Sequence, residues 1–248
     1  MNAVGLILLV AGAALFGGAW WAYGRRRAIA DTPTSNVRSM AIGPVELQGT
    51  AAAAPGRELL RAPFTDEPCV YWEYKVEEQR TRHTKNGTQT YWATVESGRS
   101  KAPIGLRDET GVATIDPEGA DMPGPMVAQF GSGFQRDPTP RIQEFLLKKD
   151  IRFEGLFGLN KRMRFTENRL PEGATLYVLG NATRREDAGA EAAVGNAALV
   201  VQRHGPGAFL VSTSSEKALL RNWTIGFWAL LLSGIAAAAA GASVLGAP

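Results

Sequence analysis

Uncharged, apolar residues occupy both ends of the chain, and a charged middle separates them. Residues 1–24 and 223–248 contain no Asp, Glu, Lys or Arg, so every charged side chain lies between Arg25 and Arg221. A helix needs about 20 apolar residues to cross the hydrocarbon core of a bilayer. We therefore predict membrane-spanning helices over residues 1–24 and 223–246, with a domain of residues 25–222 between them.

Two other interpretations of these ends were weighed. The first run could be a cleaved signal peptide, but its cationic cluster follows the apolar stretch, whereas a signal peptide carries positive charge before it. The second run could be a buried Ala-rich core helix. Its length and lack of charge favour a span instead. Both runs are therefore taken as membrane helices, which makes the lipid bilayer the first expected partner.

The orientation of the spans is predicted from the flanking cations. Arg25, Arg26 and Arg27 follow the first run, and Lys217 and Arg221 precede the second. Loops rich in Lys and Arg remain on the cytoplasmic side. We expect an integral membrane protein with residues 25–222 in the cytoplasm and both termini outside.

The middle of the chain shows the two-residue period of β-strands. Residues 69–82 alternate most clearly, with Val70, Trp72, Tyr74 and Val76 on one face. Asn86-Gly87 is a strong hairpin turn, and residues 88–97 return from it. Further strands are expected near residues 44–53, in a hairpin around residues 108–111, and on either side of a turn within residues 161–186. The pattern predicts a mainly β fold, an antiparallel barrel or sandwich of seven to nine short strands.

The remaining segments are expected to be simpler. A short helix is predicted over residues 140–149 with Thr139 as its N-cap, and residues 120–140 are expected to lack regular structure because they are rich in Gly and Pro. Residues 197–213 are expected to form a strand pair around residues 205–207. Thr213 and Glu216 have capping-box spacing, which predicts a helix that runs on into the second span.

Few residues offer chemistry. Ser214 and Lys217 have Ser-x-x-Lys spacing, but the capping box explains the same residues. Cys69 and His83 could pair as a thiolate site, although a cysteine that begins an apolar strand is more often a core residue. One cysteine and two histidines exclude a disulfide framework and a cysteine-rich zinc site. No catalytic residue, metal ligand or cofactor is predicted.

One cluster of cations is a candidate surface for binding. Residues 148–169 hold seven cations against three acidic residues. On a domain tethered to a membrane, such a patch could bind anionic lipid headgroups or a partner, although an ordinary solvated face explains it equally well. A net charge of +3 is too small to indicate nucleic-acid binding. The predicted patch comprises Lys148, Lys149, Arg152, Lys161, Arg162, Arg164 and Arg169.

Five segments in order resemble the GIDE-type family, also known by its "beside a membrane" domain. They are "DTPTSNVRSMAIGPVELQGTA", "APFTDEPCVYWEYKVEE", "RDETGVATIDPEGA", "RFTENRLPEGATLYVLGNATRRE" and "FLVSTSSEKALLRN". That family includes a mitochondrial RING-type E3 ubiquitin ligase, the mitochondrial ubiquitin ligase activator of NF-κB, and many prokaryotic membrane proteins. The resemblance is strongest to the prokaryotic branch and covers nearly the whole chain.

The resemblance implies a regulatory or partner-binding domain between two spans. In the mitochondrial ligase, ubiquitin transfer depends on a zinc-binding RING that follows the second span. A RING needs seven or eight Cys and His ligands, and residues 223–248 contain none. The family's ligase activity is therefore not expected of these residues alone.

Two classes of function follow. The first is a non-enzymatic membrane-tethered domain that binds or senses a protein partner at the membrane surface, in a stress or conflict response. The second is an enzyme, either an E3 ubiquitin transferase-like component that needs a RING supplied in trans, or a hydrolase whose site cannot be assembled from sequence. The partner's identity is not indicated by the sequence.

Overall fold

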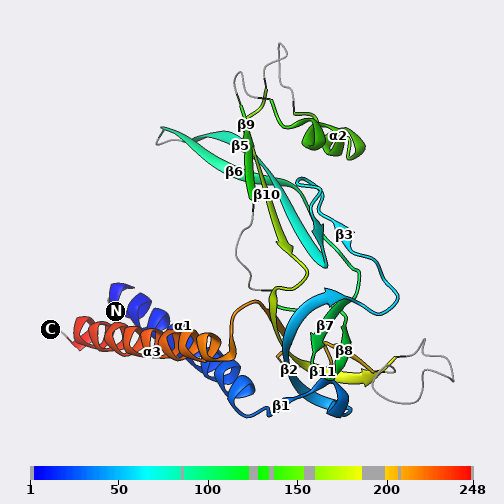
Figure 1. Cartoon of the computed structure of the whole chain (residues 1–248). Helices are drawn as coiled ribbons and strands as arrows, with labels where there is room; N and C mark the ends of the chain where they lie inside the picture. The colour runs from blue at the N-terminus through cyan, green and yellow to red at the C-terminus, as the bar shows by residue number, and fades with distance from the viewer. Residues whose placement is uncertain are drawn as a thin grey trace.

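The computed structural model contains two long helices, a β-barrel and a second sheet that stands away from the barrel (Figure 1). It describes residues 3–84, 87–122, 128–133, 137–153, 160–185, 199–205 and 208–246. Strand is the main secondary structure between the helices, so the predicted mainly β domain between two apolar helices is confirmed.

The two helices, α1 (Ala3–Ala30) and α3 (Glu216–Gly246), pack antiparallel along their lengths. Small residues make this close contact possible: a Cβ atom on Gly12 would lie 3.2 Å from the backbone of both Gly234 and Ala238. The large apolar side chains of both helices point outward and are exposed. Lipid is the solvent that suits such a surface, and both helices are long and apolar enough to cross a membrane.

Five strands close into a barrel. In chain order these are β2 (Gly43–Ala53), β7 (Ile104–Asp108), β8 (Gly111–Ile115), β11 (Thr175–Arg184) and β12 (Leu199–Gln202). Their spatial order is β2-β7-β8-β12-β11, and β11 pairs with β2 to complete the ring. This is a five-stranded Greek-key barrel of the OB type, which confirms the barrel alternative.

The barrel is not wholly antiparallel. β8 and β12 pair in parallel, as do β2 and the short β1 (Thr34–Ser35). The other short strand, β13 (Leu210–Ser212), lies antiparallel to the first half of β11, while β12 pairs with its second half. The structure therefore corrects the expectation that β12 and β13 pair with each other, because both use the same edge of β11.

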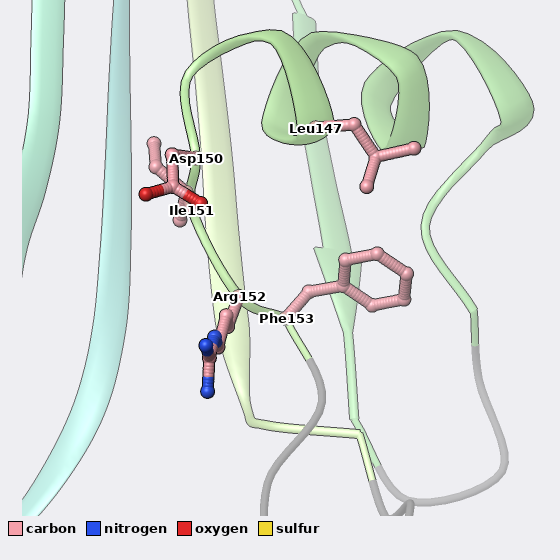
Figure 2. Close-up of a pocket in the computed structure, with 5 residues that line it drawn as sticks. All are labelled: Leu147, Asp150, Ile151, Arg152 and Phe153. Carbon is pink, nitrogen blue, oxygen red and sulfur yellow. The ribbon is translucent and has the colours of Figure 1, made fainter.

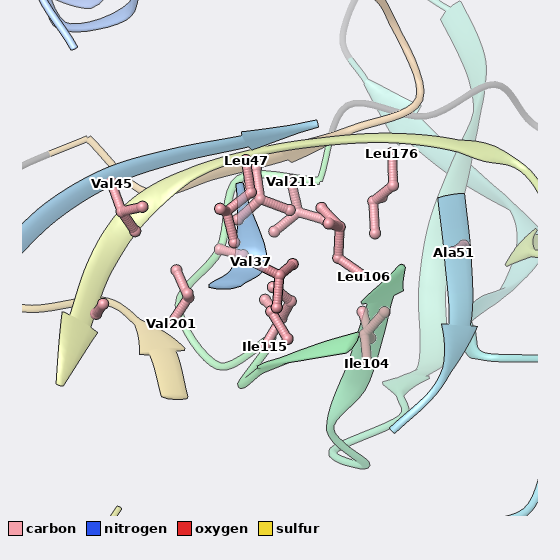
Figure 3. Close-up of a cluster of buried hydrophobic side chains, with 14 of the residues drawn as sticks. Val37, Val45, Leu47, Ala51, Ile104, Leu106, Ile115, Leu176, Val201 and Val211 are labelled. Carbon is pink, nitrogen blue, oxygen red and sulfur yellow. The ribbon is translucent and has the colours of Figure 1, made fainter. Parts of the chain in front are cut away.

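Aliphatic side chains from every barrel strand fill the barrel (Figure 3). Val45, Leu47 and Ala51 of β2 meet Ile104 and Ile115 across it. A Cβ atom on Gly49 would lie 2.3 Å from the carbonyl oxygen of Arg107, so glycine is required where β2 curves across β7. η1 (Val37–Ser39), in the segment between α1 and β2, adds buried Val37 to this core.

Two insertions into the barrel sequence build the second sheet. β5 (Tyr71–Thr84) and β6 (Gly87–Arg99) lie between β2 and β7, while β9 (Ala128–Ser132), α2 (Pro140–Lys148) and β10 (Met163–Leu170) lie between β8 and β11. The sheet order is β6-β5-β10-β9. We call this sheet together with α2 the outer layer. A largely aromatic cluster forms its core: Phe64, Tyr74, Val76, Ile142, Leu146, Met163 and Phe165.

The barrel is joined directly to the two apolar helices. Ile29 of α1 and Leu219 of α3 pack against Tyr177, Leu179 and Leu210. Tyr177 donates a hydrogen bond to the buried carboxylate of Glu46, with 2.8 Å between the oxygens. The barrel therefore sits against the end of α1 and the start of α3, and the outer layer lies farther from the two helices (Figure 1).

Several expectations about single elements are confirmed. Thr139 caps α2 by accepting a hydrogen bond from the Ile142 amide, and Ile142 and Leu146 are buried. β5 and β6 form the predicted long hairpin, although its turn, residues 85–86, lies outside the described residues. The two strands joined by residues 109–110 also form as predicted.

Other expectations were wrong. β9 lies within residues 120–140, which were expected to lack regular structure, and it forms because β10 offers an unpaired edge. The thirteen strands among the described residues exceed the expected seven to nine, since pairs of two residues such as β3 (Leu60–Arg61) and β4 (Pro68–Cys69) leave little periodic signal. Ser215, not Thr213, caps α3 by accepting from the Ala218 amide.

Candidate functional site

The seven cations of the predicted patch all belong to the outer layer, but most have acidic partners. Lys148 and Lys149 lie at the end of α2, Arg152 follows it, and the other four lie in β10 or just before it. The patch is therefore a surface of mixed charge rather than a block of free cations. The ion pairs are Lys148–Glu144, Lys149–Glu96, Lys161–Glu78, Arg164–Glu77 and Arg169–Glu67.

One of these contacts surrounds Glu77, at a bulge where the register of β5 against β6 shifts. Its buried carboxylate accepts a hydrogen bond from Arg164 at 2.7 Å and forms an ion pair with Lys75 at 2.9 Å. Burial opposes ionisation, yet the hydrogen bonds from Lys75 and Arg164 hold the pKa of Glu77 below its usual value. The same Arg164 guanidinium lies 4.7 Å from the ring centre of Trp92.

A second contact ties the end of α2 to β6. Glu96 accepts hydrogen bonds from Lys149 and from the Tyr74 hydroxyl, each at 3.1 Å. The hydrogen bond from Lys149 lowers the pKa of Glu96. The end of α2 is therefore held at a fixed distance from the sheet.

The C-terminus of α2 forms a Schellman motif. Asp150 adopts a left-handed conformation with φ of 53°, the Ile151 amide donates to the carbonyl of Leu146 at 2.9 Å, and the Asp150 amide donates to that of Leu147 at 3.1 Å. Ile151 and Leu146 share the aromatic cluster beneath, as the motif favours. This turn fixes the direction in which the chain leaves the helix.

A pocket of about 280 Å³ lies at this helix end, lined by Leu147, Asp150, Ile151, Arg152 and Phe153 (Figure 2). Leu147 and Phe153 lie on the same side of the opening in this view. Leu147 is 72% exposed. The pocket thus combines apolar walls with Arg152, a cation that belongs to none of the ion pairs of the described residues. No signal in the sequence pointed to this pocket, because its residues meet only through the turn after α2.

Two carboxylates are fully buried away from the patch. Glu167 of β10 accepts hydrogen bonds from the Phe64 amide and from Thr65, whose hydroxyl lies 2.6 Å away, and so ties the segment between β3 and β4 to the outer sheet. Glu46 accepts from Thr34, Gln48 and Tyr177. The pKa of Tyr177 is raised, mainly because the side chain is buried and also because its hydroxyl donates a hydrogen bond to Glu46. Both carboxylates are satisfied structural anchors.

The candidate nucleophiles are not brought together. Cys69 is fully buried, and burial raises the pKa of its thiol to about 11, which disfavours the reactive thiolate. His83 is exposed in the outer half of β5 and contacts Thr88. The Ser214 amide donates a hydrogen bond to the Ser212 hydroxyl, and Lys217 lies in the first turn of α3. Within the described ranges, no three His, Cys, Asp or Glu side chains form a group that could hold a metal ion.

The predicted orientation determinants lie at the membrane end of the barrel. Arg25 forms an ion pair with Asp121 and lies over the ring of Trp21 at 5.3 Å, while Arg26 donates to Thr224 of the other helix at 3.0 Å. Arg27 pairs with Asp31 at 2.8 Å. Lys217 and Arg221 lie in the first turns of α3, on the same side as these arginines.

Comparison with known families is decisive for the classification. The GIDE family, described as "E3 Ubiquitin ligase", matches residues 73–246, which include the outer layer, most of the barrel and α3. The chain belongs to the GIDE family. The match confirms the resemblance seen in the sequence, and the apolar helices agree with a GIDE domain beside a membrane. No curated protein and no solved structure matches the chain.

Proposed function

We propose that this GIDE protein binds a protein partner at the cytoplasmic surface of a prokaryotic cell membrane, through its outer layer and without catalysis of its own. The observation that carries the proposal is the apolar pocket at the end of α2, beside an exposed leucine. Exposed apolar side chains rimmed by charge are typical of protein-binding surfaces. A role in stress or conflict response belongs to this proposal.

The chemistry of the pocket favours one type of partner. Leu147 and Phe153 would receive an apolar side chain, and Arg152 in the pocket wall would attract an acidic residue beside it. The Schellman turn and the Lys149–Glu96 contact hold the pocket in shape before binding, which reduces the entropy lost on association. The partner is therefore expected to present an apolar anchor within an acidic segment.

The orientation is part of the proposal. Arg25, Arg26 and Arg27 lie beside the start of α3, so all the flanking cations gather at one end of the helix pair. The positive-inside rule assigns that end to the cytoplasm. A cysteine introduced in the barrel of the membrane-embedded protein should resist an impermeant thiol reagent added from outside, and labelling from outside would overturn the assignment.

The partner proposal is tested by capture from solubilised membranes. The full-length protein is compared with Leu147→Asp and with Ile42→Asp, a matched control, since Ile42 is 67% exposed but lies before β2 of the barrel. A protein that is enriched by the wild type and by Ile42→Asp, and lost with Leu147→Asp, supports the proposal. Equal capture by all three overturns it.

A second function has one specific finding in its favour, the ubiquitin-ligase description of the family. In that case the protein would act as a transferase-like component with a RING supplied in trans, because these 248 residues contain one cysteine and two histidines. The two functions are distinguished by an assay of ubiquitin transfer. The assay contains a conjugating enzyme and a separate RING subunit, and transfer is measured with and without this protein. If the protein increases the rate of ubiquitin transfer, the transferase-like role is supported. If the rate is unchanged, partner binding without catalysis is the function that is supported.

A further inference from the structure

The outer half of the β5–β6 hairpin projects beyond the rest of the outer layer. β10 pairs with β5 only from Tyr71 to Glu78, whereas β5 and β6 remain paired as far as Thr84 and Gly87. We call residues 79–84 and 87–93 the arm. The Gln79 amide still donates to the Arg162 carbonyl, so the five residues that follow it in β5 reach roughly 16 Å past the sheet, at about 3.3 Å per residue. A two-stranded ribbon of this length has no core of its own to bury.

The arm is cationic. Residues 79–93 contain Arg80, Arg82 and Lys85 and no Asp or Glu. Arg80, whose side chain is 49% exposed, lies 3.3 Å from the mostly buried Glu78 at the base of the arm. Arg82 takes part in none of the ion pairs found in the described part of the chain. Arg82 therefore faces solvent, whereas Arg80 shares Glu78 with Lys161 of the patch.

Exposed aromatic side chains accompany these cations on both faces. The register places Tyr91 opposite Arg80 on one face, and Trp92 opposite Gln79 on the other. Tyr91 is 46% exposed and Trp92 is 38% exposed, with Arg164 over the Trp92 ring. Arginine beside tyrosine or tryptophan is the composition that proteins place at the interface between water and lipid.

The arm also points in a suitable direction. In Figure 1 the hairpin leans toward the side of the barrel from which α1 and α3 extend. The barrel is packed against the membrane end of those helices through Ile29, Leu219 and Tyr177. A ribbon that leans to this side approaches the bilayer in which the helices lie.

We propose that the arm rests in the headgroup layer of that bilayer, where Arg80 and Arg82 bind the phosphates of anionic lipids and Tyr91 and Trp92 lie at the interface. The arm would then act as a third attachment beside the two spans, and it would set the angle at which the outer layer is presented. This inference concerns different residues from the partner pocket, so either proposal can fail without the other.

The test uses the full-length protein in lipid nanodiscs, either neutral or containing phosphatidylserine. An environment-sensitive fluorophore is attached to Thr90→Cys, in a Cys69→Ala background. In discs with phosphatidylserine, the emission should rise and shift to shorter wavelength relative to neutral discs. High salt should reverse the change, because electrostatic binding at a surface is screened.

Two double variants distinguish lipid binding by the arginines of the arm from lipid binding by the overall positive charge of the protein. Arg80→Gln with Arg82→Gln should lose most of the emission change, whereas Arg57→Gln with Arg107→Gln, which removes two exposed cations elsewhere, should keep it. The proposal is overturned if neutral and anionic discs give the same emission. It is equally overturned if the two double variants lose the same amount, or if the probe responds to an added protein fraction but not to lipid.

Discussion

The barrel and the outer layer are β-structures of similar size that differ in their edges and cores. The barrel closes on itself through the β2–β11 pairing and is filled with aliphatic side chains. The outer layer is an open sheet with β6 and β9 at its edges, and its core consists largely of aromatic rings beneath α2. The closed structure joins the membrane helices, and the open structure carries the pocket and the arm.

The difference shows how the two tasks are divided. A closed barrel satisfies its backbone hydrogen bonds internally and offers a stable base for the helices. An open sheet leaves edges, projecting strands and charged side chains available for contact. Because the outer layer is made of two insertions into the barrel sequence, it depends on the barrel, while the barrel has closed pairing of its own.

The largest effect is expected in the barrel. Ile115→Ala should cost about 3–5 kcal/mol of unfolding free energy, since a closed barrel cannot collapse around the missing side chain. Denaturant unfolding in detergent should show the loss, and hydrogen exchange should show reduced protection in the barrel and the outer layer together. Ile42→Ala, at an exposed site, serves as the control and should change little.

A smaller and more local loss is expected in the outer layer. Ile142→Ala should cost about 2–3 kcal/mol, because α2 covers one face of the sheet and can move to fill the space. Hydrogen exchange should then increase in α2 and β10 and remain unchanged in β2 and β8. Equal loss of protection in β2 and β8 would show that the two regions unfold as one unit.

Acid should affect the outer layer through Glu77. Its pKa is lowered in the folded protein, so the ionised carboxylate contributes stability above the unfolded value of 4.5, and this contribution is lost as the pH falls below it. Hydrogen exchange of β5 and β10, compared between pH 7 and pH 3, should rise more in the wild type than in Glu77→Gln. An equal rise in both would remove Glu77 as the cause.

Asp108 provides the corresponding test in the barrel. Burial opposes its ionisation, but hydrogen bonds from the Val37 amide and from Thr110 lower its pKa. Asp108→Asn should therefore reduce the acid sensitivity of the β7–β8 hairpin and leave that of β10 unchanged, which separates the two regions by their carboxylates.

The smallest effect is a gain. Asp150→Gly should stabilise the protein by about 0.5–1 kcal/mol, because Asp150 adopts the left-handed conformation that glycine reaches without strain. Thermal unfolding in detergent measures it. Lys148→Gly, within the last turn of α2, should instead destabilise by about 1 kcal/mol, since glycine weakens a helix interior.

Much of the fold could be predicted from local patterns. The uncharged ends predicted α1 and α3, the alternation of residues 69–82 predicted β5, and Thr139 marked the start of α2. Short strands such as β3, β4 and β9 were missed, because two to five residues carry too little periodicity. The candidate pocket was also missed, since Leu147 and Phe153 meet only through the turn at Asp150.

Charge shows where sequence reasoning ends. Seven cations within residues 148–169 suggested a free patch, yet five of them form ion pairs with carboxylates, four of which come from distant segments of the chain. The hairpin that holds Arg80, Arg82 and Tyr91 was predicted, but its projection was not, because that depends on where the pairing of β10 with β5 ends, at Glu78.

The sequence by itself determined the two apolar helices, the β-rich middle and the family, because hydropathy and strand period are local properties that neighbouring residues carry. Only the tertiary structure decided that β2 closes on β11, that two insertions assemble one outer sheet, and which cations keep a free charge. Those outcomes depend on contacts between residues far apart in the chain, such as Glu46 with Tyr177 and Glu77 with Arg164, and pairing at that range leaves no pattern in a single sequence.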